Sequence, residues 1–255
     1  MGSQTFRSKL LAGEPLVGTW VKTPSYIVCD VLARTGLDTV CLDAEHAPFD
    51  RLALDASIHT LEAGDMPALV RTPSAAAEHI LNALDCGTTG VVVPHVATEA
   101  KAKAVAKAAR FGAGGRGYAG STRAAGYTTK PMADNLRASQ EETCVIAQIE
   151  DLEALDEIEE IAAVDGIDCL FVGRIDLTVA MGASSPSDNQ VIEAVELVCE
   201  VGKKHNRRVG MFLSDPSEIP GWLDKGANLF LLGSDHGFML AGAKALTEQF
   251  AGYKR

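Results

Sequence analysis

Short apolar runs rich in β-forming residues alternate with longer segments of helical periodicity along almost the whole chain of 255 residues. Eight such runs predict strands, at residues 16–21, 39–42, 68–71, 90–93, 144–149, 169–172, 209–213 and 229–232. Each is followed by a segment with helical spacing of apolar residues, at 25–35, 51–63, 75–86, 98–110, 152–163, 190–205, 217–225 and 236–250. This alternation is typical of repeated βα units around a parallel sheet. Eight units in about 250 residues favour one α/β domain over residues 1–255, a (β/α)8 TIM barrel.

The alternative is an open, doubly wound sheet, which more often has fewer strands and a nucleotide-binding fingerprint after the first. Residues 112–117 spell G-x-G-x-x-G but follow a helix rather than a strand, so we do not interpret them as a dinucleotide site. The long connection at 111–142 follows the fourth helix. We therefore expect it at the N-terminal end of the barrel, unless it crosses over to cover a neighbouring subunit's site.

Charge and cysteine usage narrow the classes of partner. The net charge is 23 − 34 = −11, and nucleic-acid binding would need clustered Lys and Arg, so we expect no nucleic-acid partner. No apolar stretch reaches the roughly 18 residues of a membrane span, and the N-terminus lacks a signal-peptide hydrophobic region. The six cysteines form no C-x-x-C pair, which is typical of buried thiols in a reducing compartment. We expect a cytoplasmic protein with no membrane partner.

Active sites of TIM barrels form at the C-terminal ends of the strands. Polar residues stand there after several predicted strands: Lys22, Asp43, Glu45, His46, Arg71, Gln148, Glu150, Arg174 and Asp176. Glu150 and Asp176 follow neighbouring strands, where two carboxylates can hold Mg²⁺ or Mn²⁺ while Gln148, water and an oxyacid complete the shell. The alternative is that both are ordinary surface carboxylates near Arg174.

His46 follows the second predicted strand, where an imidazole can face the barrel mouth. Asp85, at the end of the third predicted helix, could approach it from the adjacent βα unit and fix its tautomer; the alternative is a structural histidine. Arg71 suits a carboxylate or an enolate oxygen, or else it forms a salt bridge with Asp43 or Glu45.

Other catalytic signatures are absent from the sequence, which has no Walker A lysine motif, no G-x-S-x-G and no H-E-x-x-H. Lys22 is the only lysine near a strand end, and no better placed lysine suggests an imine-forming aldolase. His59, His79 and His205 are expected on helix surfaces. His95 and His236 lie nearer the catalytic end, and their roles stay open.

An ordered set of blocks resembles the class II, metal-dependent pyruvate aldolases of the hydroxyketoacid aldolase and citrate lyase type. The blocks are Gly18-Thr19-Trp20-Val21 with Pro24-Ser25, Asp43-Ala44-Glu45-His46, Val70-Arg71, Gly90 to Pro94, Gln148-Ile149-Glu150, and Phe171-Val172-Gly173 with Asp176-Leu177. The resemblance covers about residues 5–250. It implies a barrel of the phosphoenolpyruvate/pyruvate type, often with the last helix exchanged between subunits, assembled as a trimer of dimers.

The resemblance also implies roles for individual residues. Glu150 and Asp176 would bind Mg²⁺, Mn²⁺ or Co²⁺, which would chelate the ketoacid. Gln148, with the backbone around Gly173 and Ile175, would help to hold that ketoacid. Arg71 would stabilise the enolate oxygen, and His46 with Asp85 would transfer protons through water.

The activity implied is reversible aldol addition, which joins pyruvate or hydroxypyruvate to an aldehyde to give a 4-hydroxy-2-ketoacid. Oxaloacetate decarboxylation, or a citrate-like lyase or synthase reaction, is the alternative with the same enolate chemistry; a barrel that binds ketoacid without catalysis is a third. This chain departs from the family at Arg174-Ile175, where Pro and a small residue are common, so Arg174 either pairs with an acidic neighbour or meets an anionic substrate. Trp20 and Phe212 are expected to form apolar walls.

Overall fold

The computed structural model describes residues 5–253, and eight parallel strands in it close into a barrel. The strands are β1 (Leu16–Val21), β2 (Thr39–Asp43), β3 (Ala68–Arg71), β4 (Gly90–Val93), β5 (Cys144–Ile149), β6 (Cys169–Val172), β7 (Arg208–Leu213) and β8 (Ala227–Ser234). Each strand pairs with the next in the sequence, and β8 pairs with β1. The predicted (β/α)8 barrel is confirmed, with five of the eight strands at the predicted bounds.

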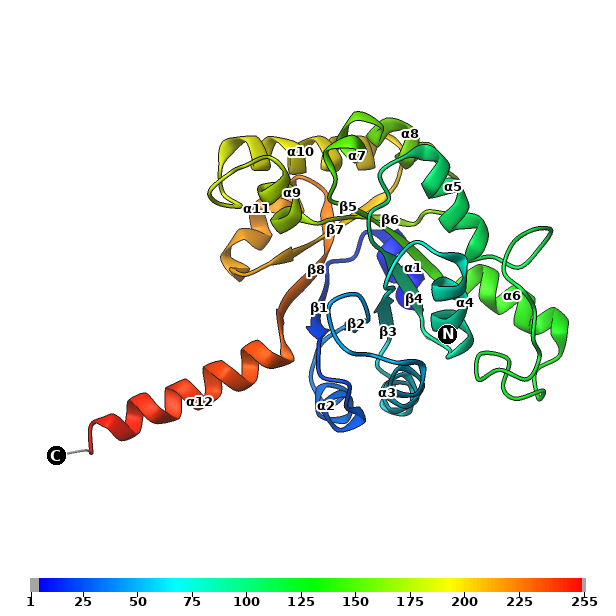
Figure 1. Ribbon diagram of the computed structural model, residues 1–255, viewed down its shortest axis with the longest axis horizontal. Coiled ribbons are helices and arrows are strands. Elements are labelled where there is room, and N and C mark those ends of the chain that lie inside the picture. Colours follow the sequence, from blue (N-terminus) through cyan, green and yellow to red (C-terminus); the bar gives the residue numbers. More distant parts are fainter. Residues whose placement is uncertain (1–4, 254–255) are drawn as a thin grey trace.

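Helices surround the barrel (Figure 1). They are α1 (Phe6–Ala12), α2 (Tyr26–Leu32), α3 (Arg51–Ala63), α4 (Ala77–Asp85), α5 (Glu99–Ala108), α6 (Met132–Glu142), α7 (Leu152–Asp156), α8 (Ile158–Ala163), α9 (Arg174–Ala180), α10 (Asn189–Lys204), α11 (Ile219–Asp224) and α12 (Asp235–Ala251), with a 3-10 turn, η1 (Pro216–Glu218). The prediction missed α1, α6 and α9. It also merged α7 and α8, which meet at Glu157.

Successive side chains of a strand point to opposite faces, and two apolar layers result. One layer lies inside the barrel and includes Cys41, Ile146 and Phe171, whereas the larger layer lies between the strands and the surrounding helices. Phe6 and Leu10 of α1 belong to the inner layer, and Asn228 of β8 donates to the Leu10 carbonyl at 3.0 Å. Because α1 precedes β1 and packs there, it covers the N-terminal end and leaves the C-terminal end open.

The connection at 111–142 lies at the N-terminal end of the barrel, as its place after a helix predicted. Arg123 pairs with Asp55 of α3 at 2.7 Å, and Arg116 pairs with Asp85 of α4 at 2.5 Å. Its second half forms α6, which buries only Asn135. The mostly polar sequence of α6 explains why it was not predicted as a packed helix.

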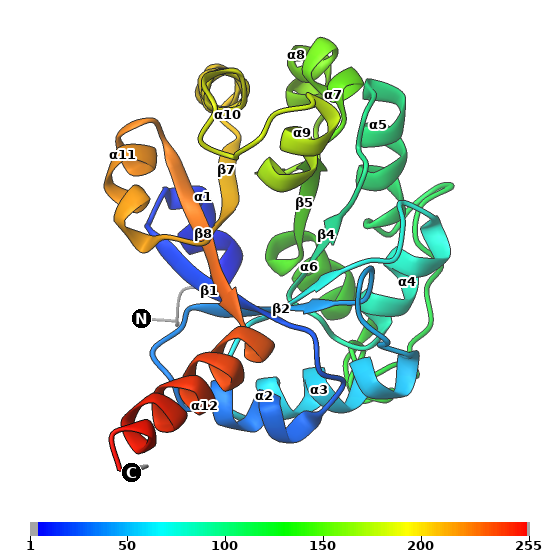
Figure 2. The same cartoon turned by 60° about the vertical axis from the view of Figure 1, so that its left-hand side comes forward.

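The last helix, α12, extends away from the barrel (Figures 1 and 2). Phe238, Met239, Leu240 and Leu246 are about half exposed or more along it. Within residues 5–253, no helix is long and apolar enough to cross a membrane.

Candidate active site

A cavity of about 380 Å³ opens at the C-terminal ends of the strands. Its lining includes eight of the residues singled out from the sequence: Trp20, His46, Arg71, Gln148, Gly173, Ile175, Asp176 and Phe212. Lys22 and Arg174 also line it. The βα topology therefore brings residues that are up to 192 positions apart in the chain to one mouth, because every strand ends at the same rim.

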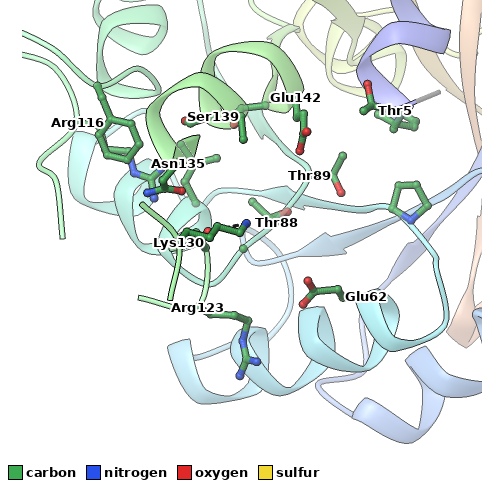
Figure 3. Close-up of a pocket in the computed structure, with 18 of the residues that line it drawn as sticks. Thr5, Glu62, Thr88, Thr89, Arg116, Arg123, Lys130, Asn135, Ser139 and Glu142 are labelled. Atoms are coloured by element: carbon green, nitrogen blue, oxygen red, sulfur yellow. Dashed lines mark hydrogen bonds between the residues drawn. The ribbon is translucent and has the colours of Figure 1, made fainter. Parts of the chain in front are cut away.

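A larger hollow, of about 700 Å³, lies at the opposite end between α3, α6 and the starts of β3 and β4. Figure 3 shows polar side chains from several elements around it, among them Arg116, Arg123 and Lys130. Arg116 and Arg123 are already paired with carboxylates of the helices, and Lys130 donates to the Ala124 carbonyl at 3.3 Å. We place the candidate active site in the smaller cavity, because the N-terminal end of a TIM barrel serves stability rather than catalysis.

Two carboxylates meet across Gly173 at the ends of β5 and β6. A Cβ added to Gly173 would lie 2.6 Å from Cβ and 2.9 Å from Oε2 of Glu150, and 3.3 Å from Oδ2 of Asp176. Glu150 is 4% exposed, and the Gln148 amide donates to its Oε2. A glycine is needed here because any larger residue would fill the space that the two carboxylates share.

Glu150 is therefore not the ordinary surface carboxylate of the alternative interpretation, and Arg174 does not pair with it. Arg174 instead pairs with Glu218 at 2.6 Å and donates to the Pro186 carbonyl at 2.8 Å. Burial raises the pKa of Glu150, although the His95 amide and the Gln148 side chain oppose this shift. Oε1 of Gln148 is buried and has no hydrogen-bond partner among residues 5–253. These oxygen donors fit a hard divalent cation.

Arg71, at the end of β3, is fixed by the carboxylate at the end of β2. Its Nε and Nη2 donate to the two carboxylate oxygens of Asp43 at 2.9 and 2.8 Å, and its Nε lies 3.4 Å from Oε2 of Glu45. The guanidinium also stacks over the Trp20 ring, 4.3 Å from its centroid. The salt bridge from Arg71 to Asp43 or Glu45, given above as the alternative to anion binding, is thus present. It holds the guanidinium in the wall of the cavity.

Burial tends to raise the pKa of Asp43, but the hydrogen bonds and charge of Arg71 outweigh it and hold that pKa below its usual value. The His46 amide also donates to Asp43, at 3.1 Å. Burial tends to lower the pKa of Arg71, and the same bonds with Asp43 raise it overall. Lys22 lies 3.3 Å from Asp43, so this carboxylate pairs with both Lys22 and Arg71.

The structure does not bring Asp85 to His46 within one chain, contrary to the expected approach from the adjacent βα unit. His46 follows β2 at the open end of the barrel, whereas Asp85 ends α4 and precedes β4, at the closed end. There Asp85 binds Arg116 at 2.5 Å. The physical reason is topological, because the C-terminus of each helix returns the chain to the N-terminal end of the next strand.

His95, whose role the sequence left open, lies at the same rim as the acid pair. Ligand atoms of Glu45, His95 and Glu150 lie within 4.8 Å of one another, a group that could hold a metal ion. Nδ1 of His95 lies 3.0 Å from Oδ1 of Asp151. Its position two residues after β4 indicated that His95 lies at the catalytic end of the barrel. The backbone bend that turns its ring towards Glu45 and Glu150 cannot be seen in a sequence.

Apolar side chains bound the rest of the cavity. Trp20 meets Phe171 edge to face at a centroid distance of 6.0 Å, and Phe212 lies on β7 beside them. Ile175, which stands where the resembling family commonly has a small residue, is 50% exposed at the mouth. These apolar side chains line the same cavity as the charged side chains of Lys22, Arg71 and Asp176.

Comparison with known proteins agrees with this geometry. The family model described as HpcH/HpaI aldolase/citrate lyase matches residues 16–241. A pyruvate aldolase of Rhizobium etli is 31% identical, over 96% of this chain and 97% of its own, and a hydroxypyruvate/pyruvate aldolase of Pseudomonas aeruginosa is 28% identical, over 97% and 92%. The crystal structure of a citrate synthase superposes with a TM-score of 0.87 at 27% identity, covering 98% of this chain and 99% of that one. The family model covers most of the chain, and the barrel and the carboxylates at its strand ends agree with it. The chain therefore belongs to the HpcH/HpaI aldolase/citrate lyase family.

Proposed function

We propose that this protein catalyses the reversible aldol addition of pyruvate or hydroxypyruvate to an aldehyde, forming a 4-hydroxy-2-ketoacid. The observation that carries the proposal is the meeting of Arg71, Gln148 and Asp176 in one cavity, with Glu150 against Gly173 in its wall. The aldolase names of the relatives support the reaction class, and they include both ketoacid donors.

Glu150 and Asp176 would hold a divalent cation, Mg²⁺, Mn²⁺ or Co²⁺. The fit rests on their carboxylate oxygens facing one space beside Gly173, and on the buried, unpartnered Oε1 of Gln148 next to them, as described for residues 5–253. When bound, the ion supplies Lewis acidity at the keto group, which makes the neighbouring C–H bond more acidic. Gln148 and the backbone at Gly173 and Ile175 orient the ketoacid in this arrangement.

Arg71 stabilises the negative charge that develops on the keto oxygen. Asp43 binds its Nε and Nη2, and among residues 5–253 Nη1 makes no hydrogen bond. The guanidinium is therefore fixed before substrate arrives, so little reorganisation is needed when the charge forms. Trp20 supports the guanidinium from one face and helps to exclude water from it.

His46 transfers the proton, through water, between solvent and the reacting atoms. Its side chain is 57% exposed, at the cavity rim, and its Nε2 lies 3.6 Å from Oε2 of Glu45. Asp85 has a part in this scheme only if the Asp85 of one copy faces the His46 of another, since the two lie at opposite ends of one barrel. The proposal therefore includes a homo-oligomer, a trimer of dimers with α12 exchanged, and the exposed apolar residues of α12 support such contacts.

The aldehyde acceptor occupies the part of the cavity lined by Trp20 and Phe212, with Ile175 at the mouth. A second candidate activity is oxaloacetate decarboxylation or a citrate-like lyase or synthase reaction. The structural match to a citrate synthase over almost the whole chain favours keeping it. Both activities use the same charge stabilisation at Arg71 and differ in the molecule that binds beside Trp20 and Phe212.

The test measures products by liquid chromatography and mass spectrometry. Purified protein with Mg²⁺ receives pyruvate or hydroxypyruvate with a panel of aldehydes, and separately oxaloacetate alone. The proposal predicts 4-hydroxy-2-ketoacids, their loss in Arg71→Ala, and no loss in Arg34→Ala, whose exposed side chain pairs with Asp30 on α2. Turnover of oxaloacetate without any aldol product would instead favour the second candidate, and a fully active Arg71→Ala protein would contradict the role of Arg71.

A further inference from the structure

Beside the Glu150–Asp176 pair, on the other side of Glu150, lies a group of which the proposed reaction uses only Glu150. It consists of Glu45 after β2, His95 after β4 and Glu150 after β5, with ligand atoms within 4.8 Å of one another. Nε2 of His95 lies 3.8 Å from Oε1 of Glu45, and its Nδ1 lies 3.4 Å from Oε1 of Glu150. Asp176 does not belong to this group.

Asp151 orients the imidazole of His95. Its two carboxylate oxygens lie 3.0 and 3.2 Å from Nδ1, so Nδ1 carries the proton and donates it to Asp151. Nε2 is then the free ring nitrogen, and it faces Glu45. Histidines that bind metals have this arrangement, in which a carboxylate holds one ring nitrogen and the other is a ligand.

The backbone of His95 also contacts Glu150. His95 has a φ of +54°, in the left-handed region that a residue with a Cβ seldom adopts. In this conformation its N–H donates to Oε1 of Glu150 at 2.8 Å, and the next amide, of Val96, donates to the Gln148 carbonyl at 3.2 Å. The loop thus fixes both the ring and the carboxylate that it faces.

The charges at this rim favour a cation. Glu45, Glu150 and Asp151 surround His95. Arg71, whose Nε lies 3.4 Å from Oε2 of Glu45, makes both of its hydrogen bonds to Asp43, so three carboxylates face the imidazole and one guanidinium lies beside them. Oε2 of Glu45 is buried and has no hydrogen-bond partner among residues 5–253. The His95 side chain is 57% exposed, so an ion can reach the group from solvent.

We infer that Glu45, Nε2 of His95 and Oε1 of Glu150 form a second cation site, which takes a divalent transition ion such as Zn²⁺ or Co²⁺ in preference to Mg²⁺. Two ligands at about 2.0–2.2 Å from one ion lie roughly 3–4 Å apart, and Nε2 and Oε1 of Glu45 are 3.8 Å apart. An imidazole with two carboxylates suits these ions, whereas Mg²⁺ prefers oxygen alone. Glu150 is shared between the two sites, with Oε2 towards Asp176 and Oε1 towards His95.

The experiment titrates metal-free protein with Co²⁺ in excess Mg²⁺ and follows the visible absorption of the bound ion. X-ray absorption spectra of the Zn²⁺ form report whether an imidazole nitrogen is bound. With excess Mg²⁺ in the Glu150–Asp176 site, wild type is expected to bind one Co²⁺ at the second site, and the Zn²⁺ form is expected to show nitrogen ligation. His95→Gln is expected to bind it at least 100-fold more weakly, and Asp151→Asn about 10–100-fold more weakly because only the orienting carboxylate is lost.

Two control variants distinguish Co²⁺ bound at this site from Co²⁺ bound at the Glu150–Asp176 site and from Co²⁺ bound to an exposed histidine elsewhere. Asp176→Asn keeps all three proposed ligands, and His59→Gln removes an exposed histidine of α3, so both are expected to bind Co²⁺ as wild type does. Unchanged Co²⁺ binding in His95→Gln, absence of nitrogen ligation, or equal loss in Asp176→Asn would overturn the second site. If His95→Gln does not fold, as judged by circular dichroism, Asp151→Asn decides the question. Ketoacid turnover with Mg²⁺ alone tests the proposed function independently of these outcomes.

Discussion

Comparing Arg71→Met with Arg71→Met/Asp43→Asn separates the catalytic role of the guanidinium from its structural role. The substitution leaves Asp43, whose side chain is fully buried, without its two strongest hydrogen bonds, and Lys22 at 3.3 Å remains as a weaker partner. Removing one member of a buried ion pair costs about 3–5 kcal/mol, and we expect the lower end because Lys22 and the His46 amide stay. For a chain of this size that corresponds to a fall in Tm of roughly 6–12 °C.

The double variant Arg71→Met/Asp43→Asn removes the uncompensated negative charge of Asp43, but it still lacks the guanidinium of Arg71. The amide that replaces the Asp43 carboxylate keeps an oxygen that can accept from the His46 amide, so most of the lost Tm should return. Turnover should remain about 10²–10³-fold below wild type, because a donor to the developing oxyanion is still missing. Thermal unfolding by circular dichroism and aldol product formation measure the two effects. Wild-type turnover in the double variant would refute the catalytic role, and an unchanged Tm in Arg71→Met would refute the stabilising pair.

Three further predictions follow from the same geometry. Gly173→Ala places a methyl group 2.9 Å from Oε2 of Glu150, so Mn²⁺ binding measured by calorimetry should weaken at least tenfold while the far-ultraviolet spectrum stays that of wild type; unchanged binding would place the ion elsewhere. The pKa of Asp43 is lowered in the folded protein, so its contribution to stability is present above the unfolded value of about 3.9 and is lost as pH falls through the folded pKa; urea unfolding between pH 3 and 6 should show a shallower acid loss for Asp43→Asn than for wild type. Ile175→Ala should widen the mouth and raise kcat/KM for bulkier aldehydes relative to small ones, and an unchanged ratio would show that Ile175 does not limit acceptor size.

The barrel was predictable because its strands are nearly continuous apolar runs that begin and end abruptly. Runs such as Gly90–Val93 and Cys169–Val172 are buried throughout, as expected for strands covered on both faces. The helices were harder, since α6 buries a single residue and α9 is a short insertion between β6 and α10. Neither presents the long apolar stripe on which a periodicity argument depends.

The candidate site was predictable where it depends on strand ends and unpredictable where it depends on loops. Arg71, Gln148 and Asp176 come together because β3, β5 and β6 end at one rim. His95 was left open, since its contact with Glu150 follows from a left-handed backbone that no residue pattern signals. Asp85 was misplaced within the chain by following sequence order, although the βα topology already puts every helix C-terminus at the opposite end.

The central claim is that this cavity removes a proton next to the keto group of pyruvate or hydroxypyruvate when a divalent ion is bound. Proton NMR of each ketoacid in D₂O, with purified protein and Mg²⁺ or Mn²⁺, measures this step without an aldehyde. The account predicts loss of the signal of the protons next to the ketone, its suppression by a chelator, its return on adding metal, and its absence in Arg71→Ala. Persistent proton signals for both ketoacids at saturating metal would contradict the account and point to a different donor or to binding without catalysis.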